Sequence, residues 1–234
     1  MQVKEISAFY EDSCVLQGVS MEVAQGEMVA LLGRNGVGKS TTLKSIMGIV
    51  HPRSGSVRFK DEEMRGRAPF VVARKGIAYV PEERRIFPGL TVRENLLMGM
   101  KTGRRGKTGK AWTIDRVYGE FPQLAARDGV QGGNLSGGEQ QMLTLMRSLM
   151  GDPELILIDE PSEGLSPIMA GVIFDIITDV HKKGMAIILV DRNLAYACTR
   201  AERVYIMSKG RIGYRGTGKE VLEDKQIQAK FLAV

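Results

Sequence analysis

The sequence predicts an α/β protein with a parallel-sheet core, a small N-terminal antiparallel β subdomain and an inserted helical subdomain. Apolar runs of strand length recur along the chain, at 28–32, 77–80, 155–158 and 186–190. Segments with helical spacing of apolar residues separate these runs, and strands that alternate with helices form parallel sheets covered on both faces. The first residues alternate apolar and polar instead, as short antiparallel strands do.

The N-terminal elements follow in order along the chain. Glycines 18 and 26 interrupt the alternating stretch, so we expect short strands there. Residues 28–32 (MVALL) are continuously apolar, which is typical of a strand buried on both faces. A glycine-rich loop follows, and then a segment from Ser40 to Met47 with apolar residues at helical spacing. A further hairpin is expected around residues 55–60.

The later elements complete the alternation. Residues 77–80 form a second core strand that Pro81 ends, and 91–150 read as helical around a glycine- and lysine-rich loop. Two more buried strands, 155–158 and 186–190, flank a helix that Ser166 caps and Pro167 begins. That helix is expected to turn these residues inward: Ile168, Val172, Ile173, Ile176, Ile177 and Val180. We interpret residues 1–234 as one domain with a helical lobe inserted at roughly 91–150.

Composition restricts the class of protein. Hydrophobic residues make up 43% and charged residues 26% of the 234 positions, as in ordinary globular proteins. The apolar stretches are far shorter than the roughly 20 residues of a membrane span. Lys4 and Glu5 argue against a signal peptide. We therefore expect a cytoplasmic protein, in which Cys14 and Cys198, without CxxC spacing, are two small buried residues rather than a disulfide or zinc site.

The positive charge is concentrated in one segment. The net charge is +6, and residues 101–110 (KTGRRGKTGK) hold five of the basic side chains and no acid, so that +1 remains without them. A solvated loop is the simplest interpretation, with contact to anionic lipid headgroups as an alternative. Because no aromatic residues are interleaved for base stacking, we do not expect a nucleic-acid partner.

The glycine-rich loop carries the strongest functional signal. Residues 33–40 (GRNGVGKS) match the phosphate-loop pattern G-x-x-x-x-G-K-[ST] at every fixed position. Glycines let backbone N–H groups point at a polyphosphate, and the following helix presents its positive end. Lys39 would reach the β- and γ-phosphates of ATP, and the Ser40 hydroxyl would bind Mg²⁺. The expected cradle consists of Gly33, Arg34, Asn35, Gly36, Val37, Gly38, Lys39, Ser40 and Thr41.

Two carboxylates follow the apolar strand at 155–158. Adjacent side chains on a strand point to opposite faces, so Asp159 and Glu160 can have separate tasks. Asp159 would support Mg²⁺, and Glu160 would act as the catalytic base that polarises the attacking water.

A third motif precedes the helical stretch that ends near Met150. Residues 135–141 read LSGGEQQ, where Ser136 suits a helix N-cap and Glu139 is its capping-box partner. A cap does not need two glycines, however. Gly137 and Gly138 leave the start of the helix bare, as close contact with a phosphate requires.

Together, GRNGVGKS, LSGGEQQ and LILIDEP resemble the ATP-binding cassette (ABC) nucleotide-binding domains, a branch of the P-loop NTPases, over essentially the whole chain. The resemblance implies a head-to-tail dimer in which each ATP lies on the phosphate loop of one subunit and under Ser136, Gly137 and Gly138 of the other. It also implies that Tyr10, 29 residues before Lys39, stacks on adenine.

Three positions depart from the general pattern of that family. Glu82 stands where a glutamine is usual; it can contact Mg²⁺ or its water, but it cannot donate a hydrogen bond when ionised. Arg192 stands at the position of a histidine, where it would hold the γ-phosphate as a fixed cation without shuttling a proton. Ser166 replaces a common aspartate.

The segments 81–99 and 160–167 are similar to the LivF-type ATPases of branched-chain amino-acid importers, although Asp191-Arg192 differs from the Glu-Gln expected there. This branch implies permease subunits contacted near residues 82–90, a second related ATPase or a homodimer, and an external binding protein. It places the chain on the inner face of the cell membrane as a peripheral subunit. Two alternatives stay open: a urea or short-amide importer, and a soluble ABC ATPase without a transport role.

Overall fold

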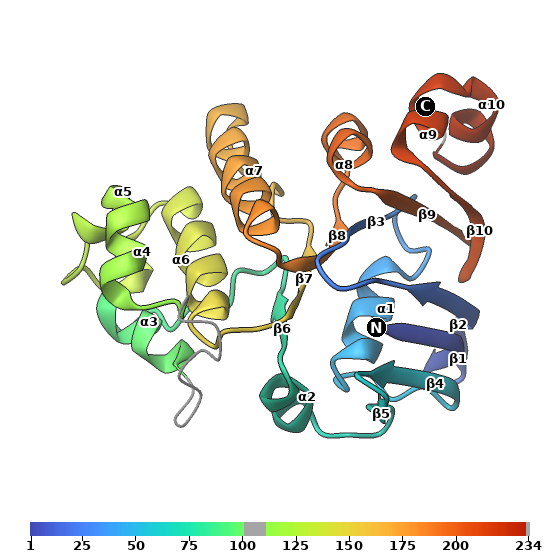
Figure 1. Cartoon of the computed structure of the whole chain (residues 1–234), viewed down its shortest axis with the longest axis horizontal. Coiled ribbons are helices and arrows are strands. Elements are labelled where there is room, and N and C mark those ends of the chain that lie inside the picture. The colour runs from blue at the N-terminus through green and yellow to red at the C-terminus, as the bar shows by residue number, and fades with distance from the viewer. Residues whose placement is uncertain (101–110, 233–234) are drawn as a thin grey trace.

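The computed structural model describes residues 1–100 and 111–232, and its centre is a six-stranded sheet (Figure 1). The strand order is β10-β9-β3-β8-β7-β6. The pairs from β9 to β6 are parallel, and β10 is antiparallel to β9. The bounds are β3 Met28–Gly33, β6 Ile77–Val80, β7 Leu155–Asp159, β8 Ala186–Val190, β9 Arg203–Ser208 and β10 Arg211–Gly216.

A second, antiparallel sheet is formed by the N-terminal strands. Its order is β2-β1-β4-β5, with β1 pairing to both β2 and β4. The strands are β1 Gln2–Tyr10, β2 Ser13–Glu22, β4 Ser54–Phe59 and β5 Glu62–Glu63. The expected antiparallel strands and the hairpin around residues 55–60 are therefore confirmed. The strands are not short, however, since β1 and β2 have nine and ten residues and β2 continues through Gly18.

The helices lie on both sides of the central sheet. Figure 1 shows α3 to α6 gathered at the left, and α1 beside the antiparallel sheet at the right. The helices are α1 Lys39–Ile46, α2 Pro69–Lys75, α3 Val92–Gly99, α4 Ile114–Glu120, α5 Pro122–Ala125, α6 Gly137–Leu149, α7 Pro167–Lys182, α8 Leu194–Arg200, α9 Gly218–Glu223 and α10 Lys225–Ile227, with a 3₁₀ turn at Gly132–Asn134 and a π turn at Gln228–Leu232.

The central sheet separates two hydrophobic cores, because successive side chains of a strand point to opposite faces. On β3, Met28, Ala30 and Leu32 belong to the core that includes α6 and α7. Val29 and Leu31 belong to the core formed with α1 and the antiparallel sheet. A strand buried on both faces must be apolar at every position, which explains the continuous run MVALL.

The helix caps agree with the sequence. Ser136 and Glu139 form a reciprocal capping box at the start of α6. Ser166 caps α7, with Pro167 in its first turn. Thr91 and Glu94 make a further capping box at α3.

Some local expectations were wrong or incomplete. Ile168 is 81% exposed, because the first turn of α7 lies outside the core, with Ser166 and Pro167 exposed as well. Cys14 is exposed on β2, whereas Cys198 is buried as expected. Strands β9 and β10 were not anticipated. The basic segment 101–110 lies outside the described residues.

Within residues 1–100 and 111–232, no helix combines the length and the apolar character that crossing a membrane requires.

Candidate active site

The carboxyl ends of four parallel strands converge at one edge of the central sheet. β3 leads into the glycine-rich loop, β7 ends at Asp159, β8 is followed by Asp191 and Arg192, and β6 leads to Glu82. Ligands of open α/β sheets bind at this edge, outside the carboxyl ends of the strands. The fold thus collects residues that are far apart in the sequence.

The loop between β3 and α1 needs glycine for steric reasons. Gly33 has φ +142, and a Cβ there would lie 2.6 Å from the carbonyl oxygen of Met207. Gly38 is the left-handed N-cap of α1, with φ 108, and a Cβ there would lie 2.7 Å from a Leu16 methyl group. No side chain caps α1, so the first N–H groups of that helix remain free to bind an anion.

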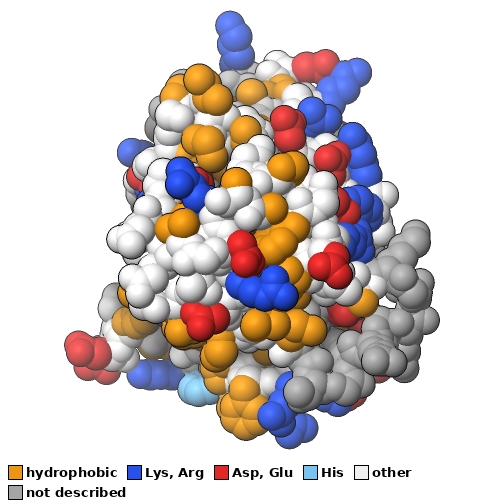
Figure 2. All heavy atoms as spheres, turned by 90° about the vertical axis from the view of Figure 1, so that its left-hand side faces the viewer, with side chains coloured by type: hydrophobic (Ala, Val, Ile, Leu, Met, Phe, Trp, Pro, Cys, Tyr) orange, Lys and Arg blue, Asp and Glu red, His pale blue; other side chains and the backbone are white. Residues whose placement is uncertain are grey.

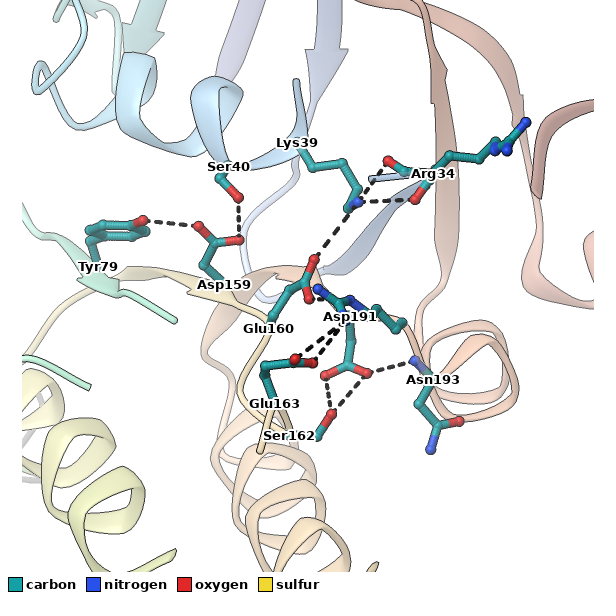
Figure 3. A network of polar contacts seen from close by, with 12 residues as sticks. Arg34, Lys39, Ser40, Tyr79, Asp159, Glu160, Ser162, Glu163, Asp191 and Asn193 are labelled. Atoms are coloured by element: carbon teal, nitrogen blue, oxygen red, sulfur yellow. Dashed lines mark hydrogen bonds and ion pairs between the residues drawn. The ribbon is translucent and has the colours of Figure 1, made fainter. Parts of the chain in front are cut away.

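Lys39 begins α1 and lies inside this loop. Its side chain is only 5% exposed, and Nζ donates hydrogen bonds to the carbonyl oxygens of Gly33 (2.9 Å) and Arg34 (3.0 Å) (Figure 3). Nζ also lies 3.8 Å from Oε1 of Glu160. Burial lowers the pKa of Lys39, and the Glu160 carboxylate opposes that effect. Because the buried ammonium has lost its hydration, an anion bound next to it would stabilise its charged form.

The side chains of Ser40 and Asp159 are hydrogen-bonded to each other next to Lys39. Ser40 Oγ donates to Asp159 Oδ1 (3.0 Å), and the Tyr79 hydroxyl donates to Asp159 Oδ2 (2.9 Å). Asp159 is 1% exposed, and burial raises its pKa although both hydrogen bonds act in the opposite direction. Both carboxylate oxygens are thus oriented by neighbouring side chains.

Glu160 follows β7 with a left-handed backbone, φ 43. Its side chain is 7% exposed, and Oε2 lies 2.6 Å from Arg192 Nε in an ion pair whose angles do not make a hydrogen bond. Burial raises the pKa of Glu160, whereas Arg192 and Lys39 lower it. A buried carboxylate with few hydrogen bonds is suited to accept a proton.

Ion pairs and hydrogen bonds connect the loop that follows β7 with the loop that follows β8 (Figure 3). Arg192 Nη1 also approaches Glu163 Oε2 at 3.2 Å. The Ser162 hydroxyl donates to Asp191 Oδ2 (2.9 Å), and the backbone N–H of Asn193 donates to Asp191 Oδ1 (2.7 Å). Asp191 is 3% exposed, and burial raises its pKa.

Glu82 and Tyr10 lie at the periphery. Glu82 is exposed, and its negative charge acts to raise the pKa values of both Lys39 and Glu160. At Glu160 this effect is smaller than the opposite effects of Arg192 and Lys39. Tyr10 ends β1 with a 47% exposed ring. Among the described residues, no hydrogen bond or ring contact joins Tyr10 to the glycine-rich loop.

The LSGGE segment stands apart from that loop within one chain. Gly138 packs against the Met169 side chain, since a Cβ there would lie 2.5 Å from its methyl carbon, and Gly137 lies against the Arg84 guanidinium. Ser136 is exposed at the start of α6. In the described part of the chain, the contacts of these residues are with α7 and the 82–85 loop rather than with the glycine-rich loop.

The site fits a magnesium nucleotide. The bare N-terminus of α1, the left-handed glycines and the buried Lys39 suit a polyphosphate. Ser40 and Asp159 supply two oxygen atoms 3.0 Å apart, a donor set that suits Mg²⁺, whose remaining ligands in nucleotide sites are phosphate and water oxygens. Thr41, which is 8% exposed, lies in the same first turn of α1.

Five residues of the network were not predicted as site residues from the sequence: Tyr79, Ser162, Glu163, Asp191 and Asn193. Tyr79 reaches Asp159 through the pairing of β6 with β7, in which it lies beside Leu157. The other four lie in the loops that follow β7 and β8, and no sequence motif marks them. Their position is the available signal, because each residue lies near the carboxyl end of a core strand.

Comparisons with known proteins agree with this arrangement. A family model described as ABC transporter matches residues 16–163. The high-affinity branched-chain amino acid transport ATP-binding protein BraG of Pseudomonas aeruginosa is 41% identical over 97% of both chains. The probable branched-chain amino acid transport ATP-binding protein LivF of Archaeoglobus fulgidus is 33% identical over 100% of this chain and 99% of its own. The lipopolysaccharide export system ATP-binding protein LptB of Escherichia coli K12 is 33% identical over 99% and 96%.

Solved structures show the same fold. A nucleotide-free ATP-binding cassette from an ABC transporter superposes with a TM-score of 0.81 at 26% identity, covering 97% of this chain and 96% of its own. An ATP binding subunit of an ABC transporter gives a TM-score of 0.82 at 29% identity, covering 99% and 95%. The predicted α/β fold class is confirmed.

Proposed function

Because the chain belongs to the ABC transporter family of ATP-binding proteins, we propose that it binds and hydrolyses ATP to energise an importer of branched-chain amino acids. The single observation that carries the ATPase part is the buried cluster at the edge of the sheet, where Lys39, Asp159 and Glu160 meet. The cargo rests on the 41% identity to BraG over nearly the whole chain, compared with 33% to LptB.

The phosphate loop would hold the polyphosphate. The free N–H groups at the start of α1 and the Lys39 ammonium are the donors, and Lys39 would exchange its bonds to Gly33 and Arg34 for bonds to phosphate oxygens. The cradle comprises Gly33, Arg34, Asn35, Gly36, Val37, Gly38, Lys39, Ser40 and Thr41. Tyr10, with half of its ring exposed, would stack on the adenine.

Hydrolysis would use Glu160 as the base. Its buried carboxylate would orient a water molecule and accept a proton from it, while Arg192 would present a fixed positive charge to the γ-phosphate. Ser40 and Asp159, with Glu82 from the neighbouring loop, would hold Mg²⁺. When bound, Mg²⁺ supplies charge neutralisation on the phosphate oxygens.

The site would be completed by a second ATPase chain, either an identical copy or a related subunit. Ser136, Gly137 and Gly138 would contact the ATP of the partner, which agrees with the contacts of the two glycines in their own chain, with Arg84 and Met169 rather than with the phosphate loop. Binding of ATP would close the dimer, and hydrolysis would release it.

Permease subunits would dock on the helical side of the molecule. Figure 2 shows this side, with hydrophobic side chains interspersed among charged ones. Exposed hydrophobic residues here are Phe87 in the loop before α3, Leu97 and Met98 on α3, and Met100 directly after it. The chain would therefore lie peripherally on the cytoplasmic face of the membrane. An external binding protein would deliver the cargo, and two permease genes beside this gene would support that assignment.

The domain organisation supports the same role. We propose that residues 1–234 form one nucleotide-binding domain, with the helical subdomain at roughly 91–150 inserted between β6 and β7. This places α6, which carries Ser136 at its start, on the same inserted unit as the permease-facing helix α3.

The assignment of the base is tested with Glu160→Gln. Because glutamine has the same shape but cannot accept the proton, kcat for ATP hydrolysis should fall by at least about 100-fold while ATP binding is retained. An ATP-bound dimer should then accumulate, detectable by size-exclusion chromatography. Glu154→Gln is the matched control. It also removes one carboxylate charge, but at the residue directly before β7, at the opposite end of that strand from Glu160, and it should hydrolyse ATP normally. Full turnover by Glu160→Gln would reject Glu160 as the base.

A further inference from the structure

The Arg192 guanidinium lies between two carboxylates. Its Nε is 2.6 Å from Glu160 Oε2, and its Nη1 is 3.2 Å from Glu163 Oε2 (Figure 3). Glu160 is buried, whereas Glu163 is 43% exposed and Arg192 is 50% exposed. The Arg192 guanidinium thus forms ion pairs both with Glu160, the proposed base, and with Glu163, a carboxylate that has no assigned role in ATP hydrolysis.

The surrounding backbone makes this arrangement specific. The N–H of Glu160 donates to the carbonyl oxygen of Val190 (2.8 Å), and Ser162 donates to the buried Asp191. The 160–163 and 190–193 segments are therefore joined on both sides of the Arg192 ion pairs. These hydrogen bonds hold the backbone of both segments. The ends of the Arg192 and Glu163 side chains are held instead by their ion pair.

Glu163 is itself held from the opposite direction. Arg84 Nη2 donates to the carbonyl oxygens of Glu163 (3.3 Å) and Gly164 (3.5 Å), and the same guanidinium lies against Gly137. The backbone of Glu163 is thus fixed toward the start of α6, while its carboxylate faces Arg192.

We propose that Glu163 is a positioning residue that holds the Arg192 guanidinium beside Glu160. An arginine side chain has many rotamers. With Glu160 as its single ion-pair partner, the guanidinium would move whenever Glu160 moves, or it would rotate into solvent. With Glu163 as a second anchor, the base and the fixed cation are presented together. This inference rests on the proposed ATP hydrolysis and adds to it a residue that acts through Arg192.

Steady-state ATP hydrolysis by the full chain at saturating Mg²⁺ tests the inference. In Glu163→Gln, kcat should fall about fivefold with KM changed less than about twofold, since orientation rather than binding is lost. Glu163→Asp, which keeps the charge, should recover part of the rate. Glu223→Gln is the control and should leave kcat unchanged, because it removes another exposed, ion-paired carboxylate from α9, far from the proposed site in the sequence. The melting temperature of Glu163→Gln should stay close to that of the wild type, because such an exposed ion pair contributes little stability.

A double-mutant cycle separates positioning from a general loop effect. Arg192→Ala should lower kcat about tenfold, and the double variant should be no slower than Arg192→Ala, because Glu163 has nothing left to position. An unchanged kcat in Glu163→Gln, or a double variant slowed by the product of both effects, would overturn the inference while the ATPase function stands. Absence of hydrolysis in the wild type would instead reject the proposed function, and the role of Glu163 with it.

Discussion

Four ionisable side chains of the described residues at the carboxyl edge of the central sheet are almost completely buried. Lys39, Asp159, Glu160 and Asp191 are 5%, 1%, 7% and 3% exposed. Burial lowers the pKa of Lys39 and raises the pKa values of the three acids, so each group pays a desolvation cost in its charged form. Such clusters are typical of functional sites, where the ligand supplies the charges that complete the balance.

Tyr79 provides a test at this scale, since its hydroxyl donates to Asp159 Oδ2 at 2.9 Å. In Tyr79→Phe the carboxylate loses a hydrogen bond that orients it, so its affinity for Mg²⁺ should weaken. We expect ATP hydrolysis to need about tenfold more Mg²⁺ for half its maximal rate. ATP binding without Mg²⁺ should not change.

The control for Tyr79→Phe is Tyr118→Phe. Tyr118 also donates its hydroxyl to a carboxylate, that of Asp128, but this pair lies in the helical lobe. Its Mg²⁺ dependence should match that of the wild type. If Tyr79→Phe and Tyr118→Phe titrate alike with Mg²⁺, Tyr79 has no part in holding the metal.

Single residues were predictable where a local motif carries the chemistry. Lys39, Ser40, Asp159 and Glu160 could be identified because the spacing of the motif and the preceding strand fix where each side chain lies. Tyr79 could not, because it reaches Asp159 only through the register between β6 and β7. The sequence gives no measure of such a register when the two strands are separated by a helical insertion.

At the scale of elements, two of the capping boxes, at α6 and α9, begin helices with different surroundings. Ser136 and Glu139 begin α6, and Thr217 and Glu220 begin α9. Replacing either cap by alanine should cost about 1 kcal/mol in the free energy of unfolding, because one helix N–H loses its acceptor. Only Ser136→Ala should also reduce ATP hydrolysis, since α9 has no proposed contact with nucleotide.

Thermal or urea unfolding together with ATPase rates checks this pair. Ser136→Ala and Thr217→Ala should lower stability by similar amounts, with a clear loss of kcat in Ser136→Ala alone. Equal rates in the two variants would mean that Ser136 acts merely as a cap.

The elements with continuous apolar runs were predicted closely. β6 and β8 have the expected bounds, and β3 and β7 extend one residue further. Ile168 shows the limit of helical periodicity: the spacing identifies a face, but it does not say how far the neighbouring sheet extends beneath it. β9 lies next to β3, and this long-range pairing has no local sequence signal.

At the scale of the whole molecule, the separation of the LSGGE segment from the phosphate loop predicts complementation between two defective chains. A Lys39→Ala chain lacks a working phosphate loop, and a Ser136→Arg chain lacks a working contact to the ATP of its partner. In a head-to-tail dimer, mixing the two creates one intact site per heterodimer. An equimolar mixture should therefore reach about a quarter of the wild-type rate, if statistical pairing holds.

Each variant alone should be nearly inactive, and dilution of the mixture should reduce the recovered activity as dimers separate. A mixture as inactive as its components would contradict a shared site. A Ser136→Arg chain with the full rate by itself would show that the site is complete within one chain.

The sheet order also has a consequence for how the protein is made. β3, which carries the phosphate loop, lies between β8 and β9, so both of its neighbours are among the last strands to be synthesised. At roughly 5–20 residues per second, the ribosome needs about 10–35 s to proceed from Gly33 to Ser208. Until β8 is made, which takes most of this interval, both edges of an apolar strand have no partner from the central sheet, and such edges readily pair with other chains. The nascent chain therefore acquires its nucleotide pocket only near the end of translation, and it depends until then on whatever shields β3 in the cell.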